Sequence, residues 1–101
     1  MSVNVGVFVE ISGLRDDREQ VGMTALLTEV VRAEGMEFEV FVSMRGEGSD
    51  LAVRADSGEH KVIFSGFFRW QPAFEERLTA RATQLVPHAQ VRFGWEYEDE
   101  F

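Results

Sequence analysis

The strongest constraint on the fold is a run near the start of the chain in which apolar and polar residues alternate. The apolar positions share one parity: Val3, Val5, Val7, Val9 and Ile11. The positions between them hold Asn4, Gly6, Phe8 and Glu10. Successive side chains of a strand point to opposite faces of a sheet. The sequence therefore predicts a first strand over residues 3–11, with one buried face and a second face that includes Phe8.

Two later stretches change to helical spacing. Asp16 or Asp17 can cap a helix over residues 18–34, with Gln20 in the capping-box position relative to Asp17 and Gly35 as the stop. Its apolar stripe is predicted to consist of Val21, Ala25, Leu26, Val30 and Ala33. Pro72 suits the first turn of a second helix, which ends before Pro87. Its apolar positions are Phe74, Leu78, Ala82 and Leu85.

The period of two returns in four other segments, over residues 37–45, 51–56, 61–70 and 90–98. Glycine-rich turn sequences at 46–50 and 56–59 separate the middle three strands. The positions predicted to face the core are Phe38, Val40, Val42, Met44, Val62, Phe64, Phe68, Trp70, Val91, Phe93, Trp95 and Tyr97. The resulting order is β-α-β-β-β-α-β.

This order predicts an α+β protein, built as a two-layer sandwich. A five-stranded mixed or antiparallel sheet carries two helices on one face, in a variant of the ferredoxin-like arrangement. A length of 101 residues and a hydrophobic fraction of 45% suffice for one core. We expect residues 1–101 to form a single α+β domain.

If only one face of the sheet is covered, the other presents aromatic side chains to the surroundings. The predicted parity places Phe8, Phe41, Ile63 and Phe67 there, among charged residues that include Glu39, Arg45, Arg69 and Glu96. A contiguous exposed apolar patch on a small protein usually marks a contact surface. Phe8, Phe41 and Phe67 are therefore predicted to contact a partner.

The charge indicates what kind of partner fits. Eighteen acidic residues against ten basic ones give a net charge of −8, which repels a phosphate backbone and predicts no nucleic-acid partner. The acidic end of the chain holds Glu96, Glu98, Asp99 and Glu100, and Glu39 adds to the negative charge. These carboxylates favour a basic protein.

No motif in the sequence specifies a reaction, so we expect no enzyme, no catalytic residue and no cofactor. His60 and His88 are the two histidines, and each stands without a nucleophile pattern beside it. Asp16 and Asp17 are explained by helix capping, so no metal site is predicted. The chain contains no cysteine, and no stretch is typical of an export signal or a membrane span. We expect a cytoplasmic location and no membrane partner.

The ending Gly94-Trp95-Glu96-Tyr97-Glu98-Asp99-Glu100, on a small acidic α+β chain without cysteine, resembles the immunity proteins that bacteria make against their own secreted nuclease toxins. The resemblance implies a protein-binding inhibitor that neutralises a basic nuclease. The aromatic face leaves two alternatives open. One is a homodimeric plait-type binder of a small molecule, or enzyme, that uses Phe8, Phe41, Phe67, Arg45, Arg69 and His60. The other is a structural subunit of a larger assembly.

Overall fold

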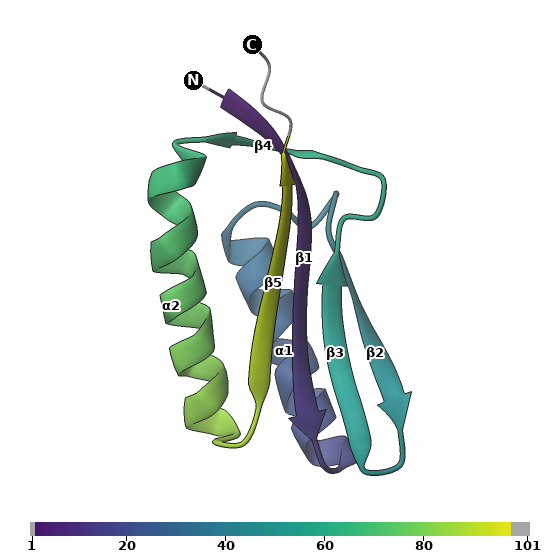
Figure 1. Ribbon diagram of the computed structural model, residues 1–101. Coiled ribbons are helices and arrows are strands. Elements are labelled where there is room, and N and C mark those ends of the chain that lie inside the picture. Colours follow the sequence, from purple (N-terminus) through teal and green to yellow (C-terminus); the bar gives the residue numbers. More distant parts are fainter. Residues whose placement is uncertain (1, 98–101) are drawn as a thin grey trace.

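The computed structural model describes residues 2–97 and confirms the predicted α+β class and element order (Figure 1). Its elements are β1 (Ser2–Leu14), α1 (Asp17–Ala33), β2 (Phe41–Glu47), β3 (Asp50–Asp56), β4 (Val62–Ser65), α2 (Phe67–Leu85) and β5 (Gln90–Tyr97). All strand pairs are antiparallel.

Strand β1 is the centre of the sheet. One of its edges pairs with β5, over Val5–Ser12. The other edge pairs first with β4, over Ser2–Val5, and then with β3, from Phe8 onward. Because β2 pairs with the far side of β3, the strands lie in the order β5-β1-β3-β2 with β4 continuing the line of β3. This is the strand order of a ferredoxin-like fold with one short strand added.

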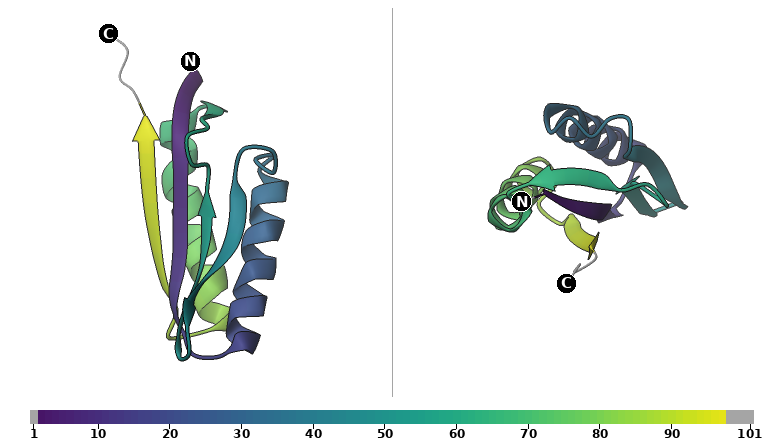
Figure 2. Two further views of the ribbon diagram at one scale, coloured as in Figure 1. Left: turned by 90° about the vertical axis from the view of Figure 1, so that its right-hand side faces the viewer. Right: turned by 90° about the horizontal axis from the view of Figure 1, so that it is seen from above.

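Both helices lie on one side of the sheet, as the two views of Figure 2 show. The odd-numbered residues of β1 face the helices and are buried, as the alternation predicts: Val5, Val7, Val9 and Ile11. Helix α1 packs mainly on β2 and β3, and α2 packs mainly on β5. The opposite side of the sheet has no helix over it within residues 2–97, so its side chains form an open face.

A buried serine joins the two strands that share an edge of β1. The Ser57 hydroxyl accepts a hydrogen bond of 2.8 Å from the Val7 backbone N–H, and the Ser57 N–H donates to the Val7 carbonyl at 2.9 Å. Ser57 therefore provides hydrogen-bond partners for the Val7 N–H and C=O of β1, at the point where β3 has ended and β4 has not begun. The following residues, Gly58 to Lys61, leave the sheet as a loop.

The predicted strand over residues 61–70 is wrong in its second half. Gly66 adopts a left-handed conformation with φ of 71°, which ends β4 and begins α2 at Phe67. The even positions from Val62 to Trp70 alternate like a strand, but Phe67, Trp70 and Phe74 also recur at the helical spacing of three and four. Packing on the sheet selects the helical alternative, and Pro72 lies inside the helix, not at its first turn.

The Phe67 side chain is consequently part of the core and not of the open face. It is 1% exposed, and its ring centroid lies 5.3 Å from that of Phe64 and 5.6 Å from that of Trp95. The prediction that Phe67 contacts a partner is therefore wrong. An aromatic cluster between α2 and the sheet surrounds it and includes Phe64, Phe67, Phe68, Trp70, Phe74, Phe93, Trp95 and Tyr97.

Strand β2 begins later than the sequence pattern predicts. The N–H groups of Glu39 and Val40 donate to the Met36 carbonyl, so residues 37–39 form a turn. This turn leaves Phe38, predicted to face the core, 82% exposed. Buried Met36 anchors the connection in its place.

The apolar stripe of α1 is also rotated from the predicted one. Of the predicted positions, Leu26 and Val30 are buried, but Val21, Ala25 and Ala33 are exposed. The buried face consists of Gln20, Met23, Leu26, Leu27, Val30 and Val31. Asp16 is the N-cap, since its carboxylate accepts a 2.9 Å hydrogen bond from the Glu19 N–H. The cap is therefore Asp16 and not Asp17, and Glu19 accepts the N–H of Arg15, one residue before the position that a regular capping box uses.

Candidate functional site

The open face is the candidate site, because it carries the exposed aromatic and aliphatic side chains of the sheet. Strand pairing sets Phe8 beside Gly94 of β5 on one side and Asp56 of β3 on the other, and Asp56 is in turn paired with Phe41 of β2. Phe41 is 59% exposed and Ile63 is 73% exposed, while Phe8 is half-buried. Ile63 of β4 is paired with Asn4, which has the parity of Phe8 on β1. The prediction that Phe8, Phe41 and Ile63 share a face is therefore confirmed.

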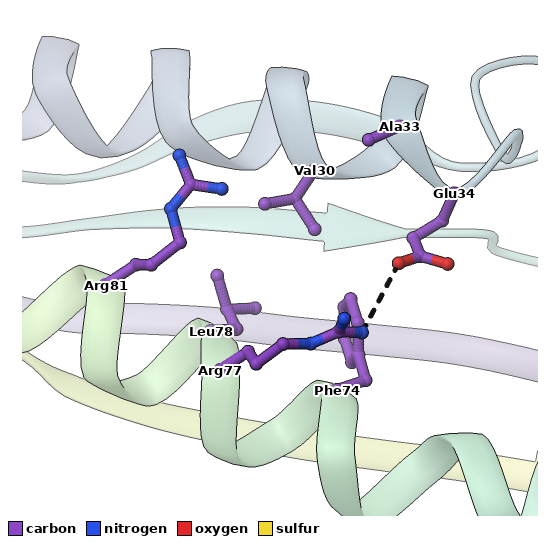
Figure 3. Close-up of a pocket in the computed structure, with 7 residues that line it drawn as sticks. All are labelled: Val30, Ala33, Glu34, Phe74, Arg77, Leu78 and Arg81. Atoms are coloured by element: carbon purple, nitrogen blue, oxygen red, sulfur yellow. Dashed lines mark ion pairs between the residues drawn. The ribbon is translucent and has the colours of Figure 1, made fainter.

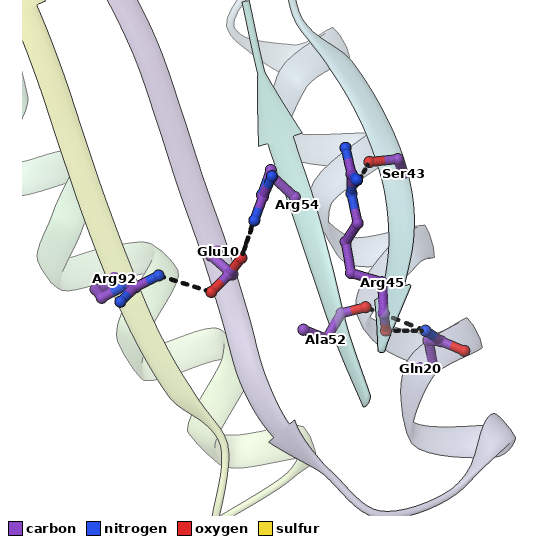
Figure 4. A network of polar contacts seen from close by, with 7 residues as sticks. All are labelled: Glu10, Gln20, Ser43, Arg45, Ala52, Arg54 and Arg92. Atoms are coloured by element: carbon purple, nitrogen blue, oxygen red, sulfur yellow. Dashed lines mark hydrogen bonds and ion pairs between the residues drawn. The ribbon is translucent and has the colours of Figure 1, made fainter. Parts of the chain in front are cut away.

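One end of the open face carries an ion-pair network that spans three strands. Glu10 of β1 accepts hydrogen bonds of 2.8 Å from Arg54 of β3 and 2.8 Å from Arg92 of β5 (Figure 4). Arg45 of β2 lies on the same face and donates to the Ser43 hydroxyl at 3.2 Å. Glu47 and Asp50, paired at the hairpin end, share the parity of Arg45 and Arg54 and are exposed. Three arginines therefore face three carboxylates, which leaves this part of the face close to neutral, although the whole chain is acidic.

The Arg54 guanidinium also connects this network to Phe8. Its central carbon lies 5.1 Å from the centroid of the Phe8 ring, within the range of a cation–π contact. The Phe8 ring also lies over Gly94, where an added Cβ would come within 3.4 Å of the Phe8 side chain. These contacts hold the ring in one place and explain why Phe8 is less exposed than Phe41.

The other end of the open face is acidic. We call this region, formed by Glu39, Asp56, Glu59 and Glu96, the acidic end. β3 and β5 finish there, β1 and β2 begin there, and the turn before β2 and the loop after β3 lie there as well (Figure 1). Lys61 is the cation that reaches into it, with its Nζ 3.7 Å from the Glu96 carboxylate. The open face is therefore divided into a charge-balanced part and an acidic part, and the exposed Phe41 and Ile63 belong to the acidic one.

The predicted partner-binding residues are brought together only in part. Phe8, Phe41 and Glu96 lie on the open face or its rim, and Glu39 lies in the turn that leads into β2. Phe67 is in the core. Glu98, Asp99 and Glu100 lie outside the described residues. Trp95 and Tyr97 face the helices, and Trp95 donates a 2.7 Å hydrogen bond to Glu75 of α2.

A hollow of about 370 Å³ lies on the open face beside Phe8. Its lining includes Gly6, Gly94, Asp56 and Glu96. Under the alternative of a homodimeric binder or enzyme, this hollow is one place for the small molecule. That alternative stays a prediction, because its cavity requires a second chain over the sheet.

A second cavity, of about 200 Å³, lies between the two helices and is a weaker candidate (Figure 3). Its polar groups already have partners: Arg77 lies 3.7 Å from Glu34, and Arg81 lies 3.2 Å from Glu29. Glu34 also accepts a 3.0 Å hydrogen bond from the Trp70 indole. These pairs link α1 to α2 across the cavity, which indicates a structural role.

The two histidines lie at opposite ends of the molecule. His60 is exposed, with its ring centroid 6.5 Å from that of Phe41. His88 Nε2 lies 2.9 Å from the Glu19 carboxylate. The pKa of Glu19 is lowered, chiefly because its carboxylate accepts the backbone N–H of Arg15 and secondly because it bonds to His88. His88 therefore secures the start of α1, a role in folding.

Neither a metal site nor a membrane-crossing helix is found among residues 2–97. No group of three acidic or histidine side chains in this range is arranged to hold a metal ion. Across the same residues, no helix is both long enough and apolar enough to span a bilayer.

One buried polar residue that the sequence pattern does not predict shapes the region beside the site. Gln20 of α1 donates from its side-chain amide to the carbonyls of Arg45, at 3.0 Å, and Ala52, at 3.1 Å (Figure 4). It thereby fixes the β2–β3 hairpin on the first turns of α1. A glutamine at a helical core position is a signal of such a tether, but its target depends on the fold.

Comparisons with known proteins bear on the fold. No protein family matches the sequence, and no curated protein matches it. Among solved structures, the chain is similar to one described as the de novo designed protein Foldit4, with a TM-score of 0.64 and 17% sequence identity. The match covers 95% of this chain and 99% of the designed chain. A likeness at this identity concerns the fold alone.

Proposed function

We propose that this protein is an acidic binding module that neutralises a basic protein partner through the acidic end of its open face. The observation that carries the proposal is the exposure of Phe41 and Ile63 on a sheet face without a covering layer, beside the carboxylates of Asp56 and Glu96. Solvent-exposed apolar side chains gathered on one face mark contact surfaces.

The division of charge on the face suits this role. A net charge of −8 attracts a basic protein over distance and raises the rate of encounter. Once the partner is in contact, the apolar side chains supply affinity because they lose water, while carboxylates around them pair with lysine and arginine. The charge-balanced other end of the face offers a basic partner no net attraction, so the acidic end sets the partner's orientation.

A secreted nuclease toxin is the partner class that we propose. A nuclease binds the phosphates of its substrate through lysine and arginine side chains. A row of carboxylates carries negative charge, as those phosphates do. The acidity of the chain, its size and its element order are those that make it resemble immunity proteins. The proposed role is inhibition by occupation of the nuclease's substrate surface.

The test uses purified basic nuclease domains from the reading frames that flank this chain's gene. We expect a complex that inhibits the nuclease, and a dissociation constant that rises steeply with NaCl because salt screens the charges. Glu96→Gln should weaken binding by about two- to fivefold, the effect of losing one exposed ion pair. Glu76→Gln removes an equal charge from the exposed side of α2 and should leave the affinity unchanged. Failure of every flanking basic protein to bind, or binding that ignores salt, would refute the proposal.

A further inference from the structure

Strand β2 forms an edge of the sheet, and its first four residues lack the usual protection against pairing, while Arg45 and Glu47 place charges on its second half. Within residues 2–97, β2 pairs with β3 and with no other strand. Its first four residues, Phe41 to Met44, carry no charge and include no proline. Natural edge strands usually avoid pairing by means of a lysine, a proline, a bulge or a covering segment. The β2 edge shows none of these over Phe41–Met44.

The backbone groups that β2 directs outward can be assigned from the Gln20 contact. The Gln20 amide nitrogen reaches the carbonyls of both Arg45 and Ala52, which are paired residues of β2 and β3. Both oxygens must therefore lie between the two strands, which makes this a hydrogen-bonded pair. Such pairs alternate along an antiparallel ladder. Val42 and Met44 therefore direct their N–H and C=O groups away from β3, toward the free edge.

Exposed apolar side chains follow the same edge. Met44 is 51% exposed on the helix side, and Phe41 is exposed on the open face. Phe38, in the turn before β2, adds a third exposed side chain near the start of the strand. The edge thus offers unpaired backbone groups together with apolar side chains on both faces of the sheet.

We propose that a second copy of this chain pairs with β2 in antiparallel fashion, about a two-fold axis through Ser43. In this register Val42 lies opposite Met44 of the second copy, so residues with outward backbone groups meet and can exchange hydrogen bonds. On the open face, Phe41 lies opposite Arg45 of the second copy, a pair suited to a cation–π contact. Symmetry repeats both pairs, so the strand is complementary to itself. The two sheets join into one.

This inference does not rest on the proposed function, but both contacts use Phe41, so the homodimer and the partner complex compete, and salt distinguishes the two. Two copies with a net charge of −8 each repel one another. Salt screens that repulsion, so the homodimer should become tighter as the ionic strength rises. Binding of a basic partner should become weaker over the same range.

The first test is sedimentation equilibrium of the full chain over a range of protein concentrations. We expect a shift from the chain mass of 11.5 kDa toward twice that value. Met44→Lys places a charge on the edge and should raise the dissociation constant of the homodimer by tenfold or more. Leu85→Lys, at the exposed end of α2, should leave that constant unchanged. A monomer at every concentration, or a dimer that Met44→Lys leaves intact, would overturn the proposal.

The second test reports the register. The chain has no cysteine, so Ser43→Cys introduces a single thiol. On the two-fold axis, in a pair without mutual hydrogen bonds, the two Cα atoms would be about 4.5 Å apart, which a disulfide can bridge. We expect rapid oxidation of the Ser43→Cys variant to a covalent dimer. Ile63→Cys, on β4 and away from the β2 edge, is the control and should form the covalent dimer slowly. Equal rates for the two variants would overturn the register.

Discussion

Phe67→Ala should lower the free energy of unfolding by about 3 to 5 kcal/mol, the usual cost of removing a buried phenyl ring. Phe67 opens helix α2 and is almost fully buried. Its ring contacts Phe64 of β4 and Trp95 of β5, so the alanine would leave a cavity where the helix meets the sheet. Urea denaturation, followed by tryptophan fluorescence, measures the loss.

The neighbouring residue gives a matched control. Phe68 is 57% exposed, and its ring contacts Phe67 and Tyr97 only at the rim of the cluster. Phe68→Ala should cost about 1 kcal/mol or less, because much of the ring is already in water. A strand through residues 61–70 would reverse this order, with Phe68 buried and Phe67 exposed. A larger loss for Phe68→Ala would therefore contradict the helical start at Phe67.

The second large effect is expected at Trp70, which connects the helices to one another. Its ring stacks on Phe74 with centroids 4.4 Å apart, and its indole N–H donates to Glu34 of α1. Trp70→Ala should cost about 3 kcal/mol, at the lower end of the range for large aromatic residues, because the ring is only partly buried. The same denaturation experiment measures this loss.

Phe41→Ala is the comparison for the opposite side of the sheet. Phe41 belongs to the open face, so its removal should change the free energy of unfolding by about 1 kcal/mol or less. Equal losses for Trp70→Ala and Phe41→Ala would mean that both faces of the sheet are covered. The two-layer account would then be wrong.

The sequence predicts the element order and the buried face of β1 because a period of two over many residues has one structural explanation. The alternation from Val3 to Ile11 can bury only one parity, and the structure buries that parity. The final strand is equally regular, and β5 lies at Gln90–Tyr97. Segments with a long, unambiguous period therefore fold as their pattern indicates.

The errors lie where two periods overlap. Between Val62 and Trp70 the aromatic residues satisfy both alternation and helical spacing, and the choice depends on Gly66 and on packing against β5. The buried stripe of α1 differs from the predicted one for another reason. Gln20 is polar, yet it is buried because its amide has two carbonyl partners on the hairpin. A pattern of apolar residues alone cannot identify a buried glutamine.

In the candidate site, too, the local pattern predicts some features and the fold decides the others. Parity alone suffices to place Phe8 and Phe41 on one face. The division of that face into a charge-balanced and an acidic part depends on the register between strands that are distant in sequence. Glu10, Arg54 and Arg92 form their network only because β3 and β5 pair with opposite edges of β1.

The most direct test of the binding account is hydroxyl-radical footprinting of the chain, free and in complex with a basic nuclease that it inhibits. Oxidation is read for each side chain by mass spectrometry. We expect the oxidation of Phe41 and Ile63 to fall on binding, and that of Leu85 and Val21, exposed on the helices, to stay unchanged. Protection of Leu85 and Val21, with Phe41 and Ile63 still oxidised as in the free chain, would show that the partner binds the helices and not the open face.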